Sequence, residues 1–94
     1  MPILSLFYGI IIRMYSEPNG KHNVPHIHAE YQESKAVFGL GGELLEGDFP
    51  KKQQKMVEAW IMIHEDDLKA DWKLLSEGQQ FFKIPPLQSE RRIP

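Results

Sequence analysis

The apolar residues of this chain repeat with two different periods, and the period changes near residue 48. Over residues 26–31 apolar and polar side chains alternate, as in a strand with one buried face. Over residues 50–77 apolar side chains recur every three or four positions, as on one side of a helix. Strands followed by helices are typical of an α+β domain, so we expect helices packed on one face of an antiparallel sheet. The helical stripe consists of Met56, Val57, Trp60, Ile61, His64, Leu68, Trp72 and Leu75.

Three or four strands are expected in a meander. Residues 7–15 are rich in isoleucine and aromatic side chains, which predicts one interior strand covered on both faces, with Gly9 marking a bulge or a close backbone approach. Residues 26–31 and 35–40 follow as the second and third strands, and residues 43–46 could add a short fourth.

The helical region is predicted to bend. Asp48 and Pro50 are residues that cap and begin helices, and Gly78 provides a stop. A straight helix over residues 50–77 would extend about 42 Å, whereas a seven-residue strand covers only about 23 Å. We therefore expect a helical hairpin or a helix bent near His64. The apolar residues in 81–87 predict a segment laid back onto the core, so residues 1–87 form one domain and residues 88–94 a flexible tail.

Composition excludes several kinds of protein. The chain has 94 residues, no cysteine and a formal charge of -2, so disulfide scaffolds, thiol nucleophiles and thiolate metal sites are excluded and a cytoplasmic location is expected. Its net charge does not support nucleic-acid binding, although local contact is left open at Lys51 and Lys52, where an acidic partner or a phosphate would also fit. The most apolar stretch, residues 3–12, is too short to span a membrane.

Histidines dominate the candidate chemistry. In a strand, His26, His28 and Glu30 share one face, and alternate residues lie about 6.5 to 7 Å apart. This spacing would let His26 and His28 share a divalent metal such as zinc, nickel or iron, with His22 or Glu30 completing the ligand set. The alternative is a solvated polar face with no site.

The same histidines could act without a metal. His26 and His28 would then supply a general base and a general acid, and Arg13 from the adjacent strand would stabilise negative charge. Tyr31 or Tyr15 could stack on an RNA base. For Arg13 we favour the alternative of a structural ion pair with Glu30 or Glu33.

A second polar group lies on the helical stripe. The spacing of His64, Asp67 and Asp71 places them toward the apolar side. Two interpretations are open: they support the strand histidines from behind, or they stabilise the helix bend. Trp60 and Trp72 are interpreted as packing residues.

The chain resembles a small bacterial family, Domain of Unknown Function 4160. The resemblance is carried by residues 7–15 and 25–31, with the His-x-His segment as its most specific part, and by Leu45-Glu46-Gly47, Pro50, Trp60, His64, Leu68, Trp72 and residues 83–87. It implies a place in a two-gene operon of toxin-antitoxin style, and it supplies no established catalytic residues.

We therefore carry three functional hypotheses. The first is a toxin-like component acting on RNA through the His26 and His28 face. The second is a non-catalytic interaction module that binds a protein or nucleoprotein partner, either a small protein or a second copy of the chain. The third is a His-ligated metal-dependent hydrolase.

Overall fold

A five-stranded antiparallel sheet and two helices form the fold in this computed structural model, which describes residues 2–15 and 24–87. The strands lie in chain order and each pairs with the next. They are β1 (Ile3–Phe7), β2 (Ile10–Arg13), β3 (His26–Tyr31), β4 (Ser34–Gly39) and β5 (Leu44–Gly47), followed by α1 (Lys51–Ile63) and α2 (Glu65–Ser76). The predicted α+β class and antiparallel meander are confirmed, with five strands instead of three or four.

The prediction of one strand over residues 7–15 is wrong. The chain reverses at Tyr8 and Gly9, both with positive φ (50° and 77°), so that Phe7 pairs with Ile10. Two consecutive positive φ angles are typical of the two-residue turns that join hairpin strands. Gly9 is therefore a turn residue, and the irregularity in pairing lies instead between Ile3 and Ser5.

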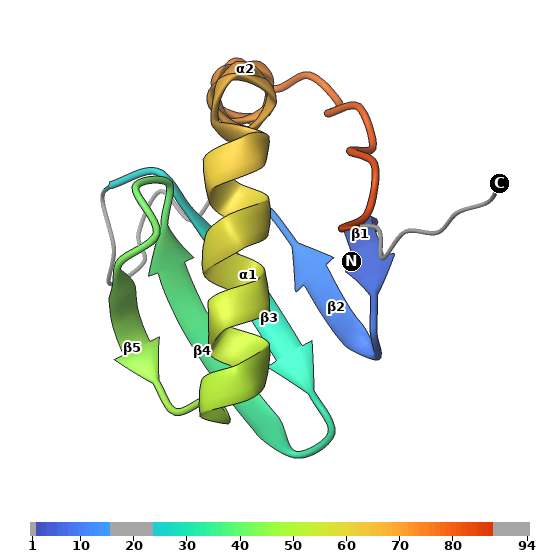
Figure 1. The fold of residues 1–94 in the computed structure, drawn as a ribbon. Coiled ribbons are helices and arrows are strands. Elements are labelled where there is room, and N and C mark those ends of the chain that lie inside the picture. The colour runs from blue at the N-terminus through green and yellow to red at the C-terminus, as the bar shows by residue number, and fades with distance from the viewer. Residues whose placement is uncertain (1, 16–23, 88–94) are drawn as a thin grey trace, which may run out of the picture.

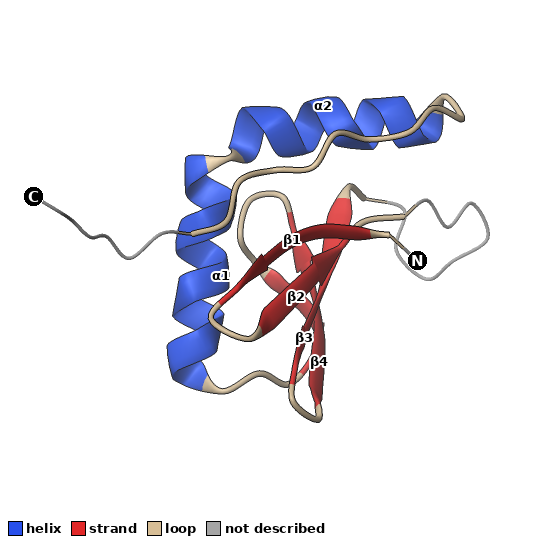
Figure 2. Ribbon diagram, turned by 90° about the vertical axis from the view of Figure 1, so that its right-hand side faces the viewer, coloured by secondary structure: helices blue, strands red, loops and turns tan. Residues whose placement is uncertain are grey.

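The core lies between α1 and one face of the sheet (Figures 1 and 2). Trp60 is fully buried, and its ring centroid lies 5.4 Å from that of Phe7. Phe38 from β4 meets Phe49 edge-on at 5.9 Å. Alternation along β2 and β3 puts Ile12 and Ala29 on this same buried face.

The predicted bend at His64 is confirmed. α1 ends at Ile63, and His64 adopts φ -110° and ψ 25° before α2 begins. α2 then crosses beyond the end of the sheet instead of continuing along α1 (Figure 2). Three acidic residues, Glu65, Asp66 and Asp67, occupy its first turn, where they interact favourably with the helix dipole.

The two predicted helix boundaries differ in outcome. Asp48 makes no cap, because Pro50 is the N-cap of α1 and no side chain caps this end. Gly78 has φ +79°, its N–H donates to the Leu75 carbonyl at 3.0 Å, and the Gln79 N–H donates to Leu74 at 2.8 Å. These two bonds make a Schellman motif, so the expected stop is confirmed.

The segment after α2 returns to the core as expected. The Ile84 N–H donates to the Leu4 carbonyl at 3.1 Å, and the Trp60 indole N–H donates to the Pro85 carbonyl at 2.9 Å. The tail predicted for residues 88–94 lies outside the described residues. Among the residues described here, neither helix has the length and apolar character needed to cross a bilayer.

Two glycines with positive φ test this geometry. Gly47 has φ +91°, and a Cβ there would overlap the Lys35 carbonyl oxygen and lie 2.9 Å from Ala36 Cα. Gly42 has φ +95° with nothing within 4 Å. Backbone strain should destabilise Gly42→Ala by about 1–2 kcal/mol, and overpacking should add roughly 1–3 kcal/mol for Gly47→Ala. Urea unfolding measures both, and equal losses would contradict the β4–β5 pairing described here.

Candidate functional site

The sheet face turned away from α1 brings together several of the predicted site residues. Arg13 pairs in register with His28, and Ile11 with Glu30. Because neighbouring residues alternate between faces, Arg13, His28 and Glu30 lie opposite the buried Ile12 and Ala29. Arg13 Nε is 3.3 Å from Glu30 Oε2, so the favoured prediction of a structural ion pair is confirmed.

The side chains of His28 and Tyr15 contact each other. The Tyr15 hydroxyl lies 3.2 Å from His28 Nδ1, and the two rings stack with centroids 4.2 Å apart and planes 9° from parallel. Tyr15 thus stacks on an imidazole in this structure, and its stacking on an RNA base stays a prediction. Packing and hydrogen bonding hold the His28 ring in one orientation.

His26 belongs to the core. Its side chain is fully buried, and its Nδ1 lies 2.7 Å from the Val24 carbonyl oxygen. Because a carbonyl only accepts, Nδ1 carries the proton in this contact. The His26 ring also lies 5.1 Å from those of His28 and Trp72. Burial leaves His26 out of reach of a substrate in this conformation.

The remaining predicted binding residues are spread over the molecule. Tyr31 lies on the α1 side, with its ring 6.4 Å from that of Phe49. Lys51 and Lys52 are exposed at the start of α1, at the opposite end of that helix from α2 (Figure 1). His22 lies outside the described residues. Within residues 2–15 and 24–87, no group of three or more His, Cys, Asp or Glu side chains is placed to hold a metal ion.

The helix trio separates into two contacts. His64 Nδ1 is 3.9 Å from Asp67 Oδ2, at the bend. Asp71 instead accepts the Phe82 N–H at 3.0 Å through Oδ1 and is only 3% exposed. From α2, the Trp72 ring contacts His26. The interpretation as bend and turn stabilisers therefore fits better than support of the strand histidines.

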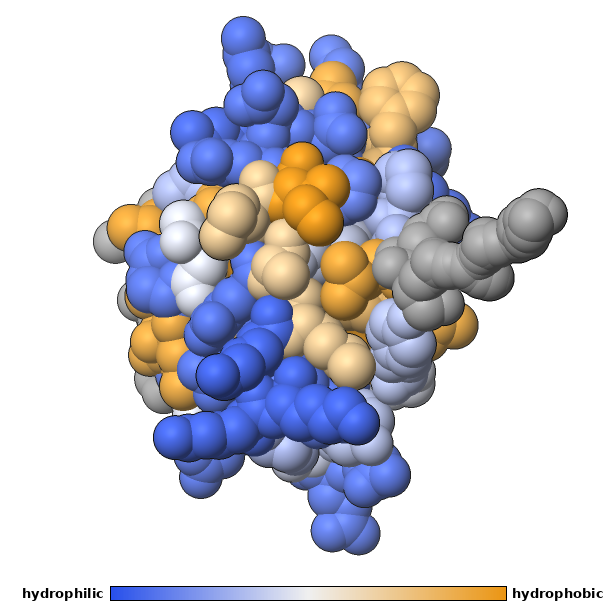
Figure 3. Space-filling model, viewed as in Figure 1, coloured by the Kyte–Doolittle hydropathy of each residue, from blue (hydrophilic) through white to orange (hydrophobic). Residues whose placement is uncertain are grey.

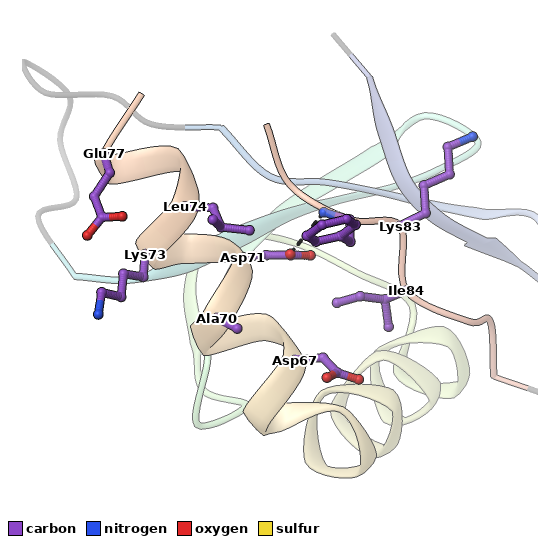
Figure 4. Close-up of a pocket in the computed structure, with 9 residues that line it drawn as sticks. Asp67, Ala70, Asp71, Lys73, Leu74, Glu77, Lys83 and Ile84 are labelled. Atoms are coloured by element: carbon purple, nitrogen blue, oxygen red, sulfur yellow. Dashed lines mark hydrogen bonds between the residues drawn. The ribbon is translucent and has the colours of Figure 1, made fainter. Parts of the chain in front are cut away.

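A cleft missed at the sequence level lies between α2 and the returning segment. We call it the α2 cleft; it has a volume of about 610 Å³ and is lined by Asp67, Ala70, Asp71, Lys73, Leu74, Glu77, Phe82, Lys83 and Ile84. Asp71 points from α2 toward the segment that carries Ile84 (Figure 4). The sequence indicated this cleft only through an aspartate on the apolar side of a helix. The group that Asp71 contacts is a backbone N–H eleven residues later, and a backbone group cannot be recognised from residue types.

Burial has a clear electrostatic effect in the α2 cleft. Desolvation raises the pKa of Asp71 above its ordinary value of 3.8. The hydrogen bond from the Phe82 N–H acts in the opposite direction, and the charge of Asp67 adds a further upward push. Asp71 Oδ2 is also buried, and no hydrogen bond reaches it within the described part of the chain.

Asp71→Asn is expected to raise the free energy of unfolding at neutral pH, because asparagine buries no charge and its carbonyl oxygen still accepts the Phe82 N–H. In wild type, the raised folded-state pKa means that the stability contributed by this group is fully present below 3.8 and is lost as pH rises through the folded-state pKa. The advantage of the variant should thus grow from acidic to neutral pH.

Urea unfolding of both proteins over this pH range measures the difference. Asp66→Asn, an exposed change on the same helix, serves as the matched control and should show no such growth. Parallel stability profiles for Asp71→Asn and wild type would show that Asp71 is not destabilised by burial.

Comparison with known proteins supports a family assignment. The family model described as Domain of unknown function (DUF4160) matches residues 9–73, which is more than half of the chain. The match begins at the β1–β2 turn and ends within α2, so it includes Arg13, His26, His28 and Asp71 but not the segment that closes the α2 cleft. Comparisons with curated proteins and with solved structures gave no match. The chain belongs to the DUF4160 family.

Proposed function

We propose that this chain is a non-catalytic interaction module that binds a protein partner. The observation that carries the proposal is a pair of adjacent, large apolar side chains at the corner between the helices. Met62 is 76% exposed and Ile63 is 65% exposed. We call these two residues the corner patch.

The corner patch is not required for folding. Val57, Trp60 and Ile61 provide the buried face of α1, so polar side chains at positions 62 and 63 would serve the helix as well. Apolar surface extends along α1 toward this corner, between hydrophilic regions (Figure 3). Burying one side chain of this size contributes about 1.5–3 kcal/mol, so a partner that covers both would gain substantially.

The sheet edges give less support for binding by strand addition. β5 is short, pairs irregularly with β4 between Val37 and Phe38, and ends at Gly47 with positive φ. At the other edge, the Leu4 carbonyl of β1 already accepts the Ile84 N–H. Short, bulged or covered edges disfavour pairing with another strand. The helical corner is therefore the better candidate surface.

The polar face of the sheet also favours a non-catalytic function. Arg13 is paired with Glu30, His28 is stacked on Tyr15, and His26 is buried. These contacts stabilise the sheet face, and an acid and a base that share a substrate would need two accessible groups. We place this binding in the cytoplasm because the chain has no cysteine. As its partner we propose a small protein encoded by the neighbouring gene, as the family resemblance implies.

The double variant Met62→Ser, Ile63→Ser should lose partner binding by at least about tenfold, because burial of one such side chain contributes about 1.5–3 kcal/mol and about 1.4 kcal/mol corresponds to a tenfold change in affinity. To measure this, the tagged chain is expressed at its natural level and purified. The sample is then analysed for a second protein that co-purifies in a stoichiometric amount. Leu6→Ser is the matched control, since Leu6 is 56% exposed on β1, away from the corner. Light scattering distinguishes a hetero-complex from pairing of two 10.9 kDa copies. Equal co-purification by both variants would contradict the proposal.

A second candidate function is favoured by one observation: Arg13, Tyr15 and His28 meet on one sheet face. This juxtaposition supports a toxin-like component that acts on RNA, with His28 as the candidate general acid or base. Induced expression of wild type, His28→Ala and the corner variant in bacteria separates the two candidates, with equal protein levels confirmed by blot. We expect His28→Ala to grow as wild type does. Growth arrest by wild type that only His28→Ala relieves would favour the toxin.

A further inference from the structure

We propose that the α2 cleft binds a primary ammonium group carried on an apolar stem, with Asp71 as its acceptor. This inference goes beyond the proposed function. Binding of a free amine can be measured without any protein partner, so the two proposals can fail separately. A lysine side chain of a partner and a small alkylamine share this chemistry. The test below distinguishes the two sources.

Only one of the two carboxylate oxygens of Asp71 accepts a hydrogen bond from the described residues. Asp71 is 3% exposed, and its Oδ1 accepts the Phe82 N–H. Its Oδ2 is buried and accepts no hydrogen bond from any described residue. A buried carboxylate oxygen without a donor costs free energy, and a ligand that donates to it recovers that loss.

The charge around the cleft selects a cation. Asp67 and Glu77 line it together with Asp71. Lys73 and Lys83 also line it, but their ammonium ends point away from Asp71 (Figure 4). The Lys69 side chain of the same helix is 3.1 Å from Glu65. Of these carboxylates, Asp67 acts on Asp71 by its charge, whereas Glu77 lies toward the far end of α2 (Figure 4).

The apolar lining of the α2 cleft indicates what kind of group should carry the ammonium. Ala70, Leu74 and Ile84 contribute apolar surface, which suits a short methylene chain and disfavours a hydrated metal ion. Because Oδ1 already accepts the Phe82 N–H, a ligand that donates to both oxygens would have to share Oδ1 with that hydrogen bond. A guanidinium binds best to two oxygens at once, whereas an ammonium acts as a point charge. The cleft should therefore prefer a primary amine over a guanidine.

A ligand reaches Oδ2 only after a local rearrangement, because this oxygen is buried. Phe82 lies next to the carboxylate, because its backbone N–H donates to the other oxygen, Oδ1. The Phe82 side chain is 74% exposed and so has little packing to lose. Side-chain rearrangement of this kind is common when a ligand binds.

The α2 cleft also adjoins the corner patch. Asp67 lines the cleft and lies 3.9 Å from His64, which directly follows Ile63. A partner seated on the corner could therefore place a lysine in the cleft. The cation site is nevertheless defined by the cleft alone.

The experiment titrates the labelled full chain with n-butylammonium chloride and follows the Phe82 amide and the Asp71 carboxyl carbon by NMR. We expect saturable shifts and a lower pKa of Asp71 in the presence of the amine, because a cation stabilises the charged form. Asp71→Asn should weaken binding about tenfold or more. Asp66→Asn, on the same helix but outside the cleft, should leave binding unchanged.

Three further probes make the result specific. n-Butylguanidinium and 1-butanol should each bind more weakly than n-butylammonium. N-acetyl-lysine N-methylamide should bind as well as n-butylammonium if the natural ligand is a protein side chain, and much more weakly if only small amines enter. Non-saturable shifts, equal binding of 1-butanol, or unchanged binding by Asp71→Asn would overturn the proposal. Clearly tighter binding of n-butylammonium by the Lys83→Met variant would also overturn the proposal. In that case the Lys83 ammonium group of this chain would be the natural partner of Asp71.

Discussion

The buried indole of Trp60 connects three parts of the fold that are distant in sequence. Its ring packs 5.4 Å from Phe7 on β1 and 5.5 Å from His64 at the bend, and its N–H donates to the Pro85 carbonyl. An indole buried without an acceptor would cost free energy, so the returning segment is needed to satisfy it. The positions of α1, the β1 edge and residues 84–85 therefore depend on one another. The α2 cleft exists because this segment is fixed on one side while α2 crosses on the other.

Sequence patterns predicted the regular elements well where local chemistry decides them. The strand over residues 26–31 and the helix stop at Gly78 depend on alternation and on positive φ, which can be recognised within a few residues. The Tyr8–Gly9 turn was missed because tyrosine rarely adopts positive φ and because the apolar run continues through it. The apolar pattern gave no signal of a reversal there.

The candidate site was less predictable because its contacts are non-local. Which partner Arg13 meets depends on the register between β2 and β3, and periodicity cannot define the register across residues 16–23. The Tyr15–His28 stack follows from that same register. The burial of His26 depends on where α2 places Trp72. Residue types alone thus suggested an exposed histidine pair, whereas tertiary packing buries His26 and stacks His28 on Tyr15, with the two imidazole rings 5.1 Å apart.

The contrast between these histidines and Asp71 argues for where binding occurs. On the sheet face, Arg13 is paired with Glu30, and the Tyr15 hydroxyl lies at hydrogen-bond distance from His28 Nδ1, so these groups contact one another. In the α2 cleft a buried carboxylate has one satisfied oxygen and one that no described residue reaches. If Asp71 served only to hold the returning segment, an asparagine would accept the same N–H without a buried charge. A carboxylate at this position is better explained by a cation that arrives from outside the chain.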